Sequence, residues 1–282
     1  KKIKKMIPVD NNSSFGFYKP NTFVSIIILF TRSIGGGWLS KRIIFLLRRI
    51  AIIFSNECID TELFNANLRM YTKGNVSEKR ALFSPQIFEE EERKYIAERA
   101  KDNSVFIDIG SNIGLYSFSI GDVYKKFKNT KIYSIEPHPY LFKRLSYNAS
   151  INKHIPIHPR EMAIMDKSGK FSLDTPEENL GQGVITDVGD NLVLGKKLSE
   201  FLLDEKIKEI SAIKIDVEGN EEKVLIPFLK ETKKENLPLI IIIENNKKLW
   251  KVDLIKLLQE KGYIIKKKTR MNYILQLNNL NN

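Results

Sequence analysis

The sequence is poor in the residues that build disulfides and metal centres. Cys58 is its single cysteine, so no internal disulfide can form. Nothing therefore requires an oxidising compartment, which favours the cytoplasm. Of the three histidines, His154 and His158 lie four residues apart. Prolines at positions 156 and 159 interrupt the helix that would bring these two side chains together. We predict no metal site at these histidines.

Long apolar runs are also missing. The runs at 23–30 and 43–47 are far shorter than the ~20 residues that span a bilayer. At the start of the chain, a proline and polar residues follow the first lysines, where a signal peptide would need an apolar stretch. We predict neither a transmembrane helix nor a signal peptide.

Acidic residues are scarce in the first part of the chain. Residues 1–55 contain ten Lys or Arg and a single acid, Asp10, and so carry +9 of the formal net charge of +12. If residues 38–54 form a helix, its basic pairs at 41–42 and 48–49 share one side of an otherwise apolar surface. Two interpretations stay open. The apolar face packs on the protein's own core, or it makes peripheral contact with an anionic membrane or a partner.

From residue 104 onward, short apolar runs alternate with segments of helical period. This pattern predicts an α/β fold with a mostly parallel, Rossmann-like sheet covered by helices. The expected strands are residues 104–107, 131–135, 157–163, 212–215 and 239–243. Residues 139–152 are expected as a helix, 89–100 as a helix with its charged face outward, and 263–277 as an antiparallel hairpin that closes the sheet. We predict a basic N-terminal segment, 1–62, and a catalytic domain, 63–282.

The end of the first predicted strand carries the first chemical signal. Its sequence DIGSNIG places Asp108, Gly110, Asn112 and Gly114 on the turn that enters a helix. Gly110 would let a ligand approach the backbone, and Gly114 would allow tight helix packing. A dinucleotide fingerprint would need glycine at Asn112, which argues against a nicotinamide cofactor. A tight turn without a ligand is the alternative interpretation.

Further acids follow the later strands. Glu136 ends the second strand, where an acid accepts hydrogen bonds from ribose hydroxyls. Asp216 and Glu218 follow the strand at 212–215, and Glu244 follows the isoleucine run. Because the carboxyl ends of parallel strands meet at one edge, we expect these acids to converge on a nucleoside there. His138 is expected to line this pocket or to be exposed rather than to act as a base.

These motifs together carry a family resemblance. DIGSNIG, EPHP, MAIMDKSGKFSL and IKIDVEGNEEKVL, in this order over residues 69–277, resemble the FkbM-type methyltransferases. The resemblance implies the class I methyltransferase sheet and O-methylation, often of a sugar, glycan or natural-product hydroxyl. It implies that S-adenosylmethionine is held by the loop 108–114, including Ser111 where alanine is usual. It also implies contacts from Glu136 and Pro137 at the ribose and from the region of Ala163 and Asp166 at the adenine.

The chemistry needs an acceptor oxygen aligned with the methyl group and a group that takes its proton. Asp216 or Glu218 is the expected base. Alternatively, Asp216 contacts the methionine end of the cofactor and Glu218 braces the loop. Lys214 either pairs with a neighbouring acid or touches the substrate.

Three other activities remain open. A nucleic-acid methyltransferase is favoured by the net charge, but the turn at 216–219 lacks the Asn/Asp-Pro-Pro-aromatic sequence expected of base-amine enzymes. A non-catalytic, membrane-associated binding module would keep the fold alone. A methyltransferase that requires a cation could use Asp216 and Glu244. The acceptor and the oligomeric state are not indicated by the sequence.

Overall fold

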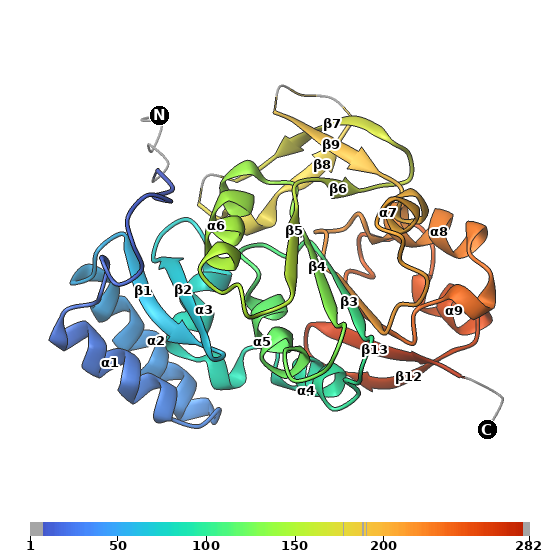
Figure 1. Ribbon diagram of the computed structural model, residues 1–282. Coiled ribbons are helices and arrows are strands. Elements are labelled where there is room, and N and C mark those ends of the chain that lie inside the picture. Colours follow the sequence, from blue (N-terminus) through green and yellow to red (C-terminus); the bar gives the residue numbers. More distant parts are fainter. Residues whose placement is uncertain (1–7, 177, 188, 190, 279–282) are drawn as a thin grey trace.

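The computed structural model describes residues 8–176, 178–187, 189 and 191–278. A seven-stranded sheet forms its centre, in the order β12-β13-β11-β10-β3-β4-β5 (Figure 1). All neighbouring strands are parallel except at β13, which is antiparallel to both β11 and β12. The strands are β3 (Val105–Ile109), β4 (Lys131–Ile135), β5 (Ile157–Arg160), β10 (Ala212–Ile215), β11 (Ile240–Glu244), β12 (Tyr263–Lys268) and β13 (Asn272–Leu277).

Helices cover both faces of this sheet because its central strands are apolar on both sides. Phe106 and Ile132 pack toward one face, and their neighbours Ile107 and Tyr133 pack toward the other. The first face is covered by α4 (Glu90–Ala97) and α5 (Leu115–Tyr124), with α6 (Pro139–Ser150) beside α5. The second face is covered by α7 (Leu198–Asp204), α8 (Glu221–Glu231) and α9 (Leu254–Glu260). The predicted α/β architecture is confirmed.

Several predicted elements have the expected bounds. The strands at 131–135 and 212–215 agree with β4 and β10, and the hairpin predicted within 263–277 is β12 and β13. The strand predicted at 157–163 is wrong in its second half. It ends at Arg160, and β6 (Ala163–Ile164) leaves the central sheet to pair with β9 (Leu192–Lys196).

That pairing belongs to a second, four-stranded sheet in the order β6-β9-β7-β8, which the sequence analysis did not predict. Its other strands are β7 (Gly169–Asp174) and β8 (Val184–Thr186), and the 3₁₀ turn Leu180–Gln182 connects them. Met165, Phe171 and Leu173 belong to its small core. In Figure 1 this sheet lies at the top of the molecule, next to the ends of β4 and β5.

The N-terminal part packs against the catalytic core. It consists of α1 (Thr22–Ser33), α2 (Trp38–Ile53), a hairpin of β1 (Cys58–Leu63) and β2 (Ala66–Tyr71), and α3 (Val76–Phe83). Their buried residues share one apolar cluster with Phe118 of α5 and Leu145 of α6. The predicted boundary after residue 62 falls inside β1. Among the described residues, no helix is both long and apolar enough to cross a membrane.

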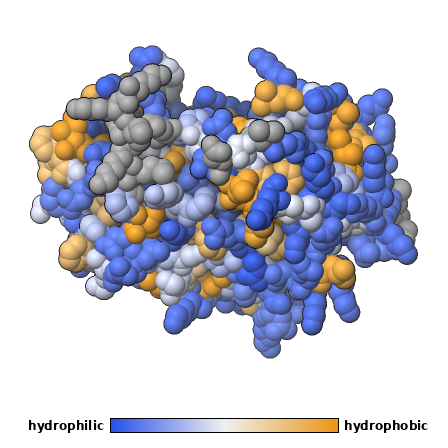
Figure 2. Space-filling view, turned by 90° about the horizontal axis from the view of Figure 1, so that it is seen from above, coloured by the Kyte–Doolittle hydropathy of each residue, from blue (hydrophilic) through white to orange (hydrophobic). Residues whose placement is uncertain are grey.

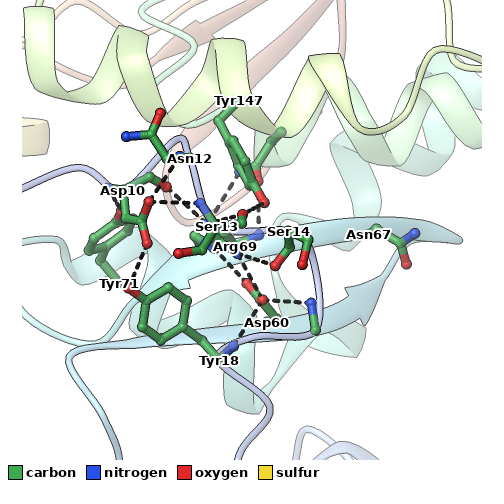
Figure 3. A network of polar contacts seen from close by, with 12 residues as sticks. Asp10, Asn12, Ser13, Ser14, Tyr18, Asp60, Asn67, Arg69, Tyr71 and Tyr147 are labelled. Atoms are coloured by element: carbon green, nitrogen blue, oxygen red, sulfur yellow. Dashed lines mark hydrogen bonds and ion pairs between the residues drawn. The ribbon is translucent and has the colours of Figure 1, made fainter.

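Arg69 on β2 connects the N-terminal lead, residues 8–21, to the β1–β2 hairpin (Figure 3). Its guanidinium contacts both carboxylate oxygens of Asp60, with Nε to Oδ1 at 2.8 Å and Nη2 to Oδ2 at 3.0 Å. The rings of Tyr18 and Tyr147 lie 4.8 and 4.4 Å from the guanidinium carbon. The guanidinium also donates hydrogen bonds to three backbone carbonyls, those of Asp10, Ser13 and Ser14. The buried guanidinium of Arg69 therefore connects the N-terminal lead, the β1–β2 hairpin and α6.

Candidate active site

Two adjoining cavities lie at the carboxyl ends of the central strands. The first, the apolar cavity, contains about 570 Å³ of space free of protein atoms, open solvent at its mouth included, and has apolar wall residues such as Ile135 and Ile185. The second, the polar cavity, contains about 470 Å³ on the same measure and has a more polar wall. The residues that border both cavities are Gly110, Asn112, Gly181, Asp216 and Glu218. Open α/β sheets bind their ligands at this edge.

Residues of the loop after β3 border both cavities. Gly110 has a φ of +79°, and a Cβ there would lie 1.8 Å from the Asp216 carbonyl oxygen. The absence of a side chain at Gly110 therefore accommodates the neighbouring backbone. The approach of a ligand to this position stays a prediction. Gly114 was predicted to allow the helix to pack tightly on the sheet, but a Cβ there would lie 2.6 Å from Leu145 of α6, so the close packing is between helices. Asn112 adopts a left-handed φ of +56°, which asparagine tolerates better than most residues.

Glu136 lies immediately after β4, in the wall of the apolar cavity. Its two carboxylate oxygens accept hydrogen bonds from the backbone N–H groups of Asn112, at 2.7 Å, and His138, at 2.9 Å. Burial raises the pKa of Glu136 to about 7. Each oxygen has a second lone pair, so the carboxylate can still accept a hydrogen bond from a hydroxyl group of a ligand.

Asp108 and Asp216 border the polar cavity. Ser117 Oγ donates to Asp108 Oδ2 at 2.6 Å, while burial raises the pKa of Asp108. Lys214 Nζ lies 2.7 Å from Asp216 Oδ2. Burial opposes the charged form of Lys214, but Asp216, Glu89 and Asp108 raise its pKa above the ordinary value. Of the two interpretations for Lys214, pairing with an acid is the one observed.

Glu218 and Glu244 extend this acidic cluster. Glu218 has a left-handed φ of +52° and borders both cavities. Burial and the charge of Asp216 raise the pKa of Glu218 to about 7. Burial and the same carboxylate raise the pKa of Glu244 to about 8. Asn246 Nδ2 donates to Glu244 Oε2 at 2.7 Å. The acids at the strand ends therefore converge as the sequence predicted.

The remaining predicted residues divide into two groups. Pro137 and Ala163 line the apolar cavity, and Ser111 lines the polar one. Asp166 does not join them, because it is exposed on the turn after β6 and Met165 contributes to the wall instead.

His138 also lines the apolar cavity. Its Nδ1 accepts a hydrogen bond of 3.2 Å from the backbone N–H of Tyr140, and this hydrogen bond caps the N-terminus of α6. Burial and nearby Arg144 lower the pKa of His138 to about 4.

Glu89 is a site residue that the sequence analysis missed. The prediction that the charged residues of 89–100 face outward is wrong for Glu89 and Glu92. Glu89 precedes α4 with a left-handed φ of +43° and borders the polar cavity. Glu92 is buried and accepts from Thr269 Oγ1 at 2.6 Å and Asn272 Nδ2 at 2.9 Å. The helical period could not reveal that Glu92 is buried, because its partners lie in a distant segment of the chain.

Buried polar atoms without a hydrogen-bond partner mark the polar cavity. Among the described residues, Asp108 Oδ1, Ser111 Oγ, Tyr116 OH and Glu89 Oε2 are of this kind, and all four residues line that cavity. Buried polar groups are normally paired, so this wall fits a ligand end with charged and hydrogen-bonding groups. Within the described ranges, no group of three or more His, Cys, Asp or Glu is arranged to hold a metal ion.

Numbered along the chain, the central strands have the order 3-2-1-4-5-7-6, with acids at the carboxyl ends of the first, second, fourth and fifth. This arrangement is that of a class I S-adenosylmethionine-dependent methyltransferase. The model of the methyltransferase FkbM domain matches residues 108–265, more than half of the chain. The protein belongs to the FkbM methyltransferase family, and its cofactor is S-adenosylmethionine.

Individual relatives are distant. The chain is 24% identical over 168 residues to the hexuronic acid methyltransferase AglP of Haloferax volcanii, an alignment of 59% of this chain and 66% of AglP. The FkbM methyltransferase of Methylobacillus flagellatus has a TM-score of 0.43 and 16% identity, covering 71% of this chain and 54% of that one. A precorrin-6y C5,15-methyltransferase of Geobacter metallireducens has a TM-score of 0.41 and 15% identity, covering 67% and 88%.

Proposed function

We propose that this protein O-methylates a hydroxyl group of a sugar, glycan or natural product. The observation that carries this proposal is the position of Asp216 and Glu218, which border both the apolar and the polar cavity. A hydroxyl group bound where the cavities meet would lie beside a carboxylate. AglP is a hexuronic acid methyltransferase, and this activity of a relative supports a sugar acceptor.

We infer that S-adenosylmethionine lies across both cavities. The apolar walls, with Ala163, suit the adenine, and Glu136 with Pro137 suits the ribose. The polar wall of the loop 108–114 suits the methionyl end. When bound, the cofactor supplies a methyl group on a sulfonium, which is already electrophilic.

Glu218 is the better candidate for the base. Asp216 is held by its ion pair with Lys214, whereas burial brings the pKa of Glu218 to about 7, near a neutral working pH. The carboxylate would accept the hydroxyl proton as the new C–O bond forms and the bond between the methyl carbon and the sulfonium sulfur breaks, which would leave S-adenosylhomocysteine. Such proton transfer contributes ~100- to 10,000-fold to a rate. Asp216 then positions Lys214 and contacts the methionyl end.

The test is methyl transfer from labelled S-adenosylmethionine to hydroxylated sugars, hexuronic acids included, with RNA as a comparison acceptor. We expect transfer to a sugar and a fall in kcat of about 100-fold in Glu218→Gln, with cofactor affinity nearly unchanged. Glu209→Gln, at an exposed acid, is the matched control. Full activity of Glu218→Gln would assign the base elsewhere. Methylation of RNA alone would favour the nucleic-acid alternative, and cofactor binding without transfer would favour a binding module.

We also propose a cytoplasmic location and peripheral contact of residues 38–54 with an anionic membrane. The partner of the active site would be a hydroxyl-bearing small molecule or glycan.

A further inference from the structure

The outer faces of α1 and α2 expose an unusual number of apolar side chains. We define the apolar face by Phe23, Ile26, Phe30, Trp38, Leu46 and Ile53, each of which is at least half exposed. The opposite faces of the same helices are buried, through Val24 and Ile28 on α1 and through Ile44 and Ala51 on α2. The helices therefore already bury one face on the protein's core. The exposed face is a second, separate surface.

Figure 1 places α1 and α2 together on the outside of the molecule, beyond the β1–β2 hairpin. The two helices pack against each other, and Phe23 of α1 contacts Phe54 at the end of α2 with ring centroids 5.4 Å apart. In Figure 2 apolar side chains gather at the corresponding left end of the molecule. Scattered apolar residues are normal on a surface, but a contiguous face of this kind marks an interaction site.

The charges around this face identify its partner. Residues 11–56 contain six Lys or Arg and no acid. Arg42 and Arg49 recur at helical spacing on the same side of α2 as Trp38, and the Arg42 guanidinium lies 4.1 Å from the centroid of the Trp38 ring. Aromatic and basic side chains together suit the headgroup region of a bilayer.

We propose that α1 and α2 lie together in the plane of an anionic lipid bilayer, with the apolar face inserted among the headgroups. Basic residues around this face would contact lipid phosphates. α3 contacts both helices and supplies Ser77 to the wall of the polar cavity. Docking would therefore hold the proposed active site close to acceptors present at the membrane surface. This inference extends the proposed contact of residues 38–54 to α1, and its membrane part does not depend on the acceptor.

The test is flotation of the full chain with phosphatidylcholine vesicles, with and without about 30% phosphatidylglycerol. We expect binding to the anionic vesicles, at least about tenfold weaker binding without the anionic lipid, and loss in high salt. The fluorescence of Trp38, which is 69% exposed, should shift to shorter wavelength on binding, whereas Trp250 is 9% exposed.

Two double variants separate the contributions of charge and apolar surface. Arg42→Glu with Arg49→Glu, and Phe30→Ser with Leu46→Ser, should each weaken vesicle binding about tenfold or more. The matched control is Leu192→Ser with Leu194→Ser on β9, because both leucines are 60% exposed. The proposal is overturned if the wild type does not float, or if the variants float equally well. A wild-type dimer that the apolar variant converts to monomers, without lipid binding, would instead assign the face to a second copy.

A second inference concerns Glu89 and does not depend on membrane binding. It rests on the cofactor being S-adenosylmethionine. Among the described residues, the wall of the polar cavity contains the carboxyl groups of Glu89, Asp108, Asp216 and Glu218 beside a single ammonium group, that of Lys214. Glu89 Oε2 is buried without a hydrogen-bond partner, and the residue lies outside the region matched by the family model. Its left-handed backbone conformation, uncommon for glutamate, also points to a functional constraint. We infer that Glu89 binds the ammonium group of the methionyl end.

The test compares S-adenosylhomocysteine with 5′-methylthioadenosine, which lacks the amino-acid end, by calorimetry. Glu89→Gln should weaken binding of the first about tenfold or more and leave binding of the second within about twofold. Glu90→Gln, at an exposed neighbour, should change neither affinity. Equal weakening of both ligands, or of neither, would overturn the role of Glu89. A wild type that binds neither ligand would overturn the cofactor assignment and this inference with it.

Discussion

Gly110 is the residue at which the site tolerates the least change. Its backbone has a φ of +79°, and a Cβ would lie 1.8 Å from the Asp216 carbonyl oxygen. Gly110→Ala must therefore move the loop after β3, which borders both cavities. We expect the free energy of unfolding to fall by about 2 kcal/mol or more, measured by urea denaturation. Gly35→Ala, where nothing lies within 4 Å of the added atom, should change stability by less than about 0.5 kcal/mol. An unaffected Gly110→Ala would contradict the backbone geometry.

Glu136 contacts both the backbone and the proposed cofactor site. It accepts hydrogen bonds from two backbone N–H groups and borders the cavity assigned to the adenosine. In Glu136→Ala we expect affinity for S-adenosylmethionine to fall about 100-fold, because ribose hydroxyls lose a charged acceptor. Titration calorimetry measures this loss, and the melting temperature checks that the variant is folded. Unchanged affinity would place the ribose elsewhere.

At the scale of elements, Arg69 determines how the N-terminal lead is attached. Its buried ion pair with Asp60 would leave an uncompensated carboxylate if the cation were removed. Arg69→Met should therefore lower the free energy of unfolding by about 3–5 kcal/mol. Lys73→Met removes the exposed pair with Glu57 and should cost less than about 1 kcal/mol. Urea denaturation compares the two variants, and similar losses in both would show that the Arg69 network is not what stabilises this region.

The elements also show where a single sequence is informative. β4 and β10 were predicted with their observed bounds because their apolar runs are flanked by polar residues. The small sheet was missed because β6 has two residues and its partner β9 lies about 30 residues further along the chain. Short strands that pair over such distances leave little local pattern. Glu92 was assigned to the surface because its partners, Thr269 and Asn272, are remote in sequence.

For the whole molecule, the acidic cluster predicts how stability depends on pH. Burial raises the pKa of Glu89, Glu136 and Glu218 to about 7 and of Glu244 to about 8, from an ordinary value of 4.5. Above pH 6.5 the unfolded chain has already lost these protons, whereas the folded chain still holds part of them. Raising the pH therefore favours the unfolded state. We expect the melting temperature of the cofactor-free protein to fall between pH 6.5 and about 8.

Bound cofactor should oppose this fall, because its cationic groups compensate the ionised carboxylates. The increase in melting temperature caused by saturating S-adenosylmethionine should therefore be larger at about pH 8 than at pH 6.5. Thermal denaturation with and without cofactor measures both effects. If Glu244→Gln and Glu218→Gln both kept the wild-type pH dependence of the melting temperature, these two carboxyl groups would be excluded as its source.

The sequence by itself determined the strands of the central sheet, the acids near the ends of successive strands, and the family resemblance, because periodicity and short motifs are local. The comparisons then established the family and cofactor. The tertiary structure decided which of those acids share a wall, that Lys214 pairs with Asp216, and that Glu89 faces the cavity. It also decided that α2 buries one face and exposes another. These properties depend on residues far apart in the chain, whose proximity only the folded arrangement creates.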